Sequence, residues 1–127
     1  MKWTHRAFLL TVALGLVPML MAPCVASMTI TPNPAPAPTA NKLKGQGFYT
    51  VGANEMFGFI KFETTLKGTT QVTSATANTN AGLKSWDSTL QVAAGTYNPT
   101  KAIVHYLDAN MKSQTTVTTS IDDQIVK

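Results

Sequence analysis

The chain has 127 residues and a formal net charge of +4 at pH 7, from 10 Lys and Arg against 6 Asp and Glu. The basic residues are spread along the chain, whereas nucleic-acid-binding proteins usually cluster them, often as arginines, in one patch. We therefore expect no nucleic acid as a partner. The single cysteine, Cys24, excludes a disulfide framework and a cysteine-rich metal site.

The first 26 residues have the order of a secretory signal peptide. They contain a basic start (Lys2 and Arg6), an apolar stretch from Ala7 to Met21 and small residues at the end. Signal peptidase requires small side chains one and three residues before the cut, and Ala26 and Cys24 provide them. We expect cleavage after Ala26, which leaves eight basic residues against six acidic ones and a net charge of +2.

Two alternatives to cleavage stay open at this segment. It could remain as a membrane anchor, although its apolar core is shorter than the ~20 residues of a spanning helix and is interrupted by Pro18. It could also be a lipoprotein signal acylated at Cys24, although Pro23 stands where a small residue is usual. We expect a secreted protein, extracellular, periplasmic or on the cell surface, that contacts no membrane after cleavage. The missing glycosylation sites and disulfides are typical of a bacterial protein.

Residues 27–44 are expected to be a Pro/Ala-rich linker. In "TPNPAPAPTANK", from Thr31 to Lys42, every second residue from Pro32 to Pro38 is proline, a pattern that disfavours helix and sheet and favours an extended polyproline II rod. An unstructured tail is the other interpretation. The folded domain is then expected over residues 45–127.

Six segments of this domain have the composition of short β-strands, rich in Thr, Val, Ile and aromatic residues and separated by turn residues. They are 45–53, 56–68, 71–77, 86–92, 102–107 and 114–121. In the second segment, alternation places Phe57 and Phe59 on one face and Ile60 and Phe62 on the other. No segment after the signal has a helical period. The sequence therefore predicts an all-β fold, an antiparallel β-sandwich of about six to seven short strands.

The second half of the domain resembles the bacterial immunoglobulin-like domains. The resemblance rests on Trp86 and Leu90, then "AAGTY" at Ala93–Tyr97, an apolar strand that ends in "DAN" at Asp108, and a Thr/Val-rich strand. It implies an Ig-like sandwich over residues 45–127, in which the hydroxyl of Tyr97 bonds to upstream backbone at a sheet corner. It also implies a spacer, adhesion or carbohydrate-associated module that catalyses no reaction.

Two features depart from that family's pattern. Met111 stands where family members commonly have glycine in the turn. In addition, Tyr97 is out of phase with the alternating residues from Ala102 to Tyr106 if these face the core. A bulge or bend at Asn98–Pro99 would restore the register, and proline in a strand is usual at such an irregularity.

Candidate catalytic and metal-binding residues are few, and we expect neither an enzyme nor a cofactor. His105 is the only histidine after the signal, and it is not accompanied by a nucleophile-elbow motif. Asp108, Asn110, Asp122 and Asp123 could offer oxygens to Ca²⁺ if the last turn met the C-terminus, although such residues are also ordinary in turns.

The candidate binding residues are apolar or aromatic. Ile103 and Leu107 lie on the strand face opposite Val104 and Tyr106, so they would expose an apolar stripe suited to a protein partner or a homo-oligomer. We therefore expect a secreted, non-catalytic structural or interaction module.

The alternative function is a carbohydrate-binding module for cell-surface polysaccharide. In such a module Trp86, with Tyr49 or Tyr106, would stack on sugar rings. The alternation of Trp86 with Leu90 and Val92 favours a core position for this tryptophan instead.

Overall fold

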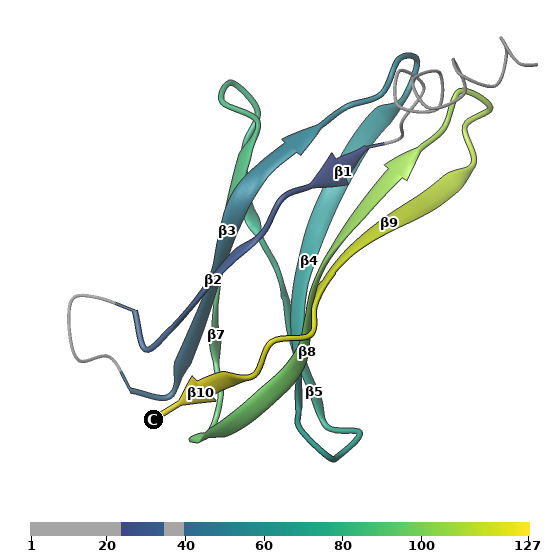
Figure 1. Ribbon diagram of the computed structural model, residues 1–127. Helices are drawn as coiled ribbons and strands as arrows, with labels where there is room; N and C mark the ends of the chain where they lie inside the picture. Colours follow the sequence, from purple (N-terminus) through teal and green to yellow (C-terminus); the bar gives the residue numbers. More distant parts are fainter. Residues whose placement is uncertain (1–23, 35–39) are drawn as a thin grey trace, which may run out of the picture.

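The computed structural model describes residues 24–34 and 40–127, which form two antiparallel β-sheets packed face to face (Figure 1). The predicted all-β class and the β-sandwich are confirmed. Within this described part, no helix has the length and apolar character that crossing a bilayer requires. The strands are β1 (Val25–Ala26), β2 (Thr29–Pro32), β3 (Lys42–Thr50), β4 (Met56–Leu66), β5 (Val72–Thr76), β6 (Asn78–Asn80), β7 (Ser85–Gln91), β8 (Gly95–Leu107), β9 (Ser113–Ser120) and β10 (Gln124–Val126).

Each sheet is built around a long strand whose edge partner is split in two. In the first sheet β1 and β2 both pair with β3, which is followed by β7 and β6. In the second sheet β9 and β10 both pair with β8, which is followed by β4 and β5. Strands β5 and β6 are also one segment that changes sheets, with only Ala77 between them. The ten strands therefore belong to seven segments, in line with the six to seven predicted.

The core lies between the sheets and consists of residues that alternate along the strands. Phe62 and Trp86 are 0% and 2% exposed, and their rings meet across the sandwich with centroids 5.7 Å apart. The indole nitrogen of Trp86 donates a hydrogen bond of 2.9 Å to the carbonyl of Ser27, which satisfies its polar end inside the core. The predicted core position of Trp86, Leu90 and Val92 is confirmed.

The fold extends further toward the N-terminus than the sequence indicated. Residues 27–44 were expected to be a linker, but β2 pairs along β3, which itself begins at Lys42, and residues 35–39 lie outside the described residues. An edge strand tolerates Pro32, because its missing N–H can face away from the ladder. Residues 1–23, most of the predicted signal peptide, are outside the described residues. Cleavage after Ala26 stays a prediction, and such a cut would remove β1.

A β-bulge at Gly58 places Phe57 and Phe59 on opposite faces of β4, whereas the alternation of the sequence predicted one face for both. Phe57 pairs with Tyr106 and Phe59 pairs with His105, so Gly58 is the extra residue. A Cβ atom on Gly58 would lie 2.7 Å from the carbonyl oxygen of His105, so only glycine fits there without a shift. Because the bulge changes the alternation, Phe57 turns inward and stacks on Tyr49 at 4.1 Å, while Phe59 turns outward. The prediction that Phe57 and Phe59 share a face is therefore wrong.

The predicted irregularity at Asn98–Pro99 is confirmed. Leu66 pairs with Tyr97 and Thr64 pairs with Thr100, so two residues of β8 stand opposite one of β4. This shift brings Tyr97, 4% exposed, into the core. Its hydroxyl donates a 2.6 Å hydrogen bond to the carbonyl of Ala93, which is the upstream backbone contact that the family resemblance implies.

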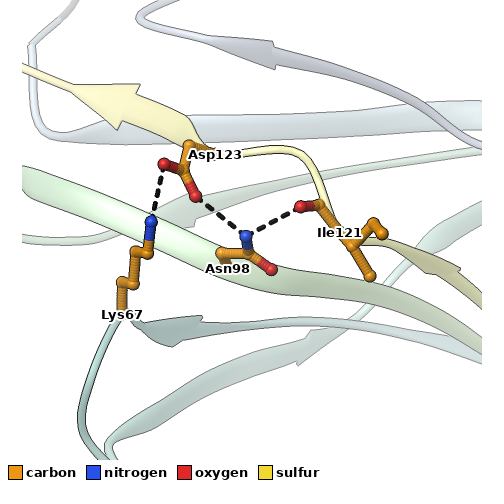
Figure 2. Close-up of polar contacts among 4 residues, drawn as sticks. All are labelled: Lys67, Asn98, Ile121 and Asp123. Carbon is orange, nitrogen blue, oxygen red and sulfur yellow. Dashed lines mark hydrogen bonds and ion pairs between the residues drawn. The ribbon is translucent and has the colours of Figure 1, made fainter.

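Side chains around this bulge fasten the link between β9 and β10 (Figure 2). The amide nitrogen of Asn98 donates to the carbonyl of Ile121 and to the carboxylate of Asp123, both at 2.8 Å. The amine of Lys67, in the turn after β4, donates to the other oxygen of Asp123 at 2.8 Å. The hydrogen bond from Lys67, followed by that from Asn98, lowers the pKa of Asp123. The break in the edge strand is thus held by polar contacts.

Candidate functional site

The outer face of the second sheet carries an unusual number of apolar side chains. Strand pairing aligns Met56 with Leu107, Phe59 with His105, and Ile103 with Val117, and in antiparallel strands paired residues point to the same face. We call the apolar members of these rows, Met56, Phe59, Ile103, Leu107 and Val117, the apolar stripe.

Three residues of the stripe, Met56, Phe59 and Leu107, line an open hollow of about 470 Å³. Its floor is the parallel stack of Phe59 on the imidazole of His105, whose ring centroids are 4.3 Å apart. The bulge at Gly58 produces this arrangement, because it turns Phe59 out of the sandwich toward His105. Ser113 and Thr115 of β9 border the hollow on its other side. The site is therefore an apolar surface with hydroxyl groups along one edge.

The predicted binding residues Ile103 and Leu107 lie on this face, opposite the buried Val104 and Tyr106 as expected. Both are only half-buried, and their neighbours Met56 and Val117 are 57% and 49% exposed. These exposed fractions show that, in the described part of the chain, the stripe is not covered by another strand or loop. Apolar side chains of this face are thus exposed to solvent.

The aromatic residues proposed for sugar stacking do not form a platform. Trp86, Tyr49 and Tyr106 are 2%, 5% and 8% exposed, and the rings of Trp86 and Tyr49 pack on other core aromatics. Stacking on a pyranose requires an exposed ring face. The prediction that Trp86 and Tyr106 stack on sugar rings is therefore wrong, and the aromatic ring that reaches the surface on the outer face of the second sheet is that of Phe59.

The polar candidates do not come together into a catalytic or metal site. Among the described residues no hydrogen bond reaches the imidazole of His105, and no three His, Cys, Asp or Glu side chains group around a common point. Asp108 follows the last residue of β8, whereas Asp123 lies beside the start of that strand. Asp108 and Asp123, two of the residues that were considered for Ca²⁺, thus lie at opposite ends of the longest strand.

The sequence analysis missed Met56 and Phe59 as members of the exposed face. Alternation assigned Phe59 to the side of Phe57, and only the bulge separates them. Gly58 was the available signal, because a glycine inside a strand often marks a bulge or a close backbone approach. Comparison of the chain with protein-family models, with curated proteins and with solved structures gives no match.

Proposed function

We propose that this protein is an exported, non-catalytic structural module of Ig-like type that assembles through the apolar stripe. The observation that carries the proposal is the position of the stripe: five apolar side chains from three neighbouring strands face solvent on one sheet. Contiguous exposed apolar surface of this kind marks interaction sites in soluble proteins. Three further features support the Ig-like type: the buried Trp86, the hydrogen bond of the Tyr97 hydroxyl and the order of the strands in the two sheets.

The occupant that we propose for the stripe is a second copy of the chain. The same face carries charges of both signs, since Glu63 pairs with Lys101 one row beyond Lys61 and Ile103. In a two-fold dimer each copy presents the same patch, so an acidic side chain of one copy can meet a lysine of the other. The stripe is also built on neighbouring strands of one sheet, which suits face-to-face packing of two sheets.

Sedimentation equilibrium of the exported protein tests this proposal, with an Ile103→Lys variant and a Thr89→Lys control. Thr89 is exposed on the outer face of the first sheet, so the control adds the same charge away from the stripe. We expect a dimer for the parent and for Thr89→Lys, and a monomer for Ile103→Lys. Val117→Lys, at a more exposed position, should also give a monomer and keeps the test valid if Ile103→Lys unfolds. A monomeric parent at all concentrations would refute the proposal.

A further inference from the structure

Three turns and the start of β1 lie at one end of the sandwich, the upper end in Figure 1. These are the β3–β4 turn (51–55), the β6–β7 turn (81–84) and the β8–β9 turn (108–112). The backbone nitrogen of Cys24, just before β1, donates to the carboxylate of Glu55 at 3.0 Å. The pairing of Met56 with Leu107 places the β3–β4 turn beside the β8–β9 turn. The backbone nitrogen of Tyr49 donates a 2.9 Å hydrogen bond to the carbonyl of Lys84, which connects the β6–β7 turn to β3.

Two of these turns repeat the same short sequence pattern. Residues 81–85 read "AGLKS" and residues 109–113 read "ANMKS", so each turn presents a large apolar residue followed by a lysine. Leu83 is 69% exposed and Met111 is 63% exposed, and Val51 at the start of the β3–β4 turn is 37% exposed. Single exposed apolar residues are ordinary. Three in the turns of one end give this end a common apolar character.

Each of the three turns contains a non-glycine residue whose backbone is in a conformation that favours glycine, including Asn54 with a φ of 61° in the β3–β4 turn. Lys84 has a φ of 51° and Met111 a φ of 63°, in the left-handed region that costs other L-residues about 1–2 kcal/mol. In the third turn the carboxylate of Asp108 holds the strained loop, because it accepts hydrogen bonds from the backbone nitrogens of Asn110 and Lys112.

The charged groups at this end are arranged so that the lysines face outward. The carboxylate of Glu55 is bonded to Cys24, and that of Asp108 to its own turn and to the amide of Gln114. Within the described residues neither Lys84 nor Lys112 forms an ion pair. The end therefore combines exposed apolar side chains with two lysines that form no ion pair among the described residues, and burial of apolar surface and attraction of cations are the two contributions to binding at the headgroup region of an anionic membrane.

We propose that this end of the sandwich docks on the surface of an anionic lipid bilayer. Leu83 and Met111 enter the boundary between headgroups and acyl chains, and Lys84 and Lys112 bind lipid phosphates. The segment that precedes β1, with its apolar stretch from Ala7 to Met21, joins the fold at this same end. A retained leader and the turns would then act on one membrane. The inference goes beyond the proposed dimer and differs from the expectation of no membrane contact after signal cleavage.

Vesicle sedimentation of the exported protein tests the proposal, with vesicles of phosphatidylglycerol and phosphatidylethanolamine in equal amounts and with neutral phosphatidylcholine vesicles as reference. Lys84→Gln with Lys112→Gln should lower partitioning to the anionic vesicles about 25-fold, since each lysine near an anionic surface contributes about fivefold. Leu83→Ser with Met111→Ser should lower it about tenfold through the lost apolar burial. All variants should melt at temperatures that show an intact fold.

Matched controls come from the other end of the molecule. Lys42→Gln with Lys127→Gln makes the same change of charge, and Ile121→Ser with Ile125→Ser removes two residues that are 78% and 52% exposed. We expect both controls to bind as the parent does. Equal losses in the controls, or no binding of the parent to anionic vesicles, would overturn the proposal and favour a protein as the occupant of this end.

A retained leader could hold every variant on the vesicles, so hydrogen exchange supplies a second readout. If the end docks on the bilayer, amides of residues 81–84 and 108–112 exchange more slowly when vesicles are present. Unchanged exchange in both turns on bound protein would also overturn the proposal. Ile103→Lys serves to separate the two proposals, because it should abolish the dimer and leave this protection in place.

Discussion

A buried pair of threonine hydroxyls offers a sharp test of how the second sheet is held together. Thr64 of β4 and Thr100 of β8 are both 0% exposed, and their Oγ1 atoms are 2.7 Å apart in a hydrogen bond inside the core. A second, long contact of 3.5 Å joins the Thr64 hydroxyl to the carbonyl of Pro99. Valine has nearly the same shape as threonine and suits a strand, so Thr→Val changes mainly the hydrogen bonding.

The magnitudes follow from which group each substitution leaves without a partner. Thr64→Val strands the Thr100 hydroxyl in the core, and a buried hydroxyl without a hydrogen bond costs about 1–3 kcal/mol. We expect a loss of about 2 kcal/mol in the free energy of unfolding. Thr100→Val should cost about 1 kcal/mol, because Thr64 can still donate to Pro99. The double variant replaces both hydroxyls and should be close to the parent in stability.

Urea denaturation followed by the fluorescence of the buried Trp86 measures the three free energies. The double-mutant cycle should give a coupling energy of about 2–3 kcal/mol, well above the error of about 0.5 kcal/mol that distant sites show. If the loss in the double variant equals the sum of the two single losses, the hydroxyls act independently and the reasoning from buried hydrogen bonding is refuted.

Three further substitutions test other features of the fold. Gly58→Ala places a Cβ atom against the carbonyl of His105 and should lower the free energy of unfolding by about 1–3 kcal/mol, measured by urea denaturation; an unchanged stability would mean that the bulge is free to adjust. Met111→Gly relieves the left-handed backbone and should raise the stability by about 0.5–1 kcal/mol, seen as a higher Tm, whereas a lower Tm would show that Met111 packs in the folded state. The folded pKa of Asp123 is lowered mainly by Lys67, so its contribution to stability is present above the unfolded pKa of about 3.9 and is lost as pH falls through the lower folded pKa. As the pH falls from about 5 to about 2, the free energy of unfolding of Asp123→Asn should therefore decrease less than that of the parent, as measured by urea denaturation at each pH. Identical pH profiles of the two proteins would contradict this assignment.

The strand pattern of the sequence was enough to predict the sandwich, because alternation reports burial wherever a strand is regular. It placed Trp86 in the core, and it required an irregularity at Asn98–Pro99 because Tyr97 was otherwise out of phase. It failed at β2, where the prolines indicated a linker and the pairing with β3 depends on contacts that local composition does not encode. Only part of the binding face could be predicted from the sequence. Phe59 reaches this face because of a one-residue bulge at Gly58, which the alternation of residues does not reveal.

The segment formed by β5 and β6 has a consequence for how the molecule opens. Its first half belongs to one sheet and its second half to the other, and the single residue between them, Ala77, is buried and bonded through its N–H to the carbonyl of Ile60 at 2.8 Å. The sheets then cannot separate unless this segment loses its pairing with at least one of them. Unfolding should accordingly be one cooperative event, and the most protected amides of the two sheets should exchange with the same free energy of opening.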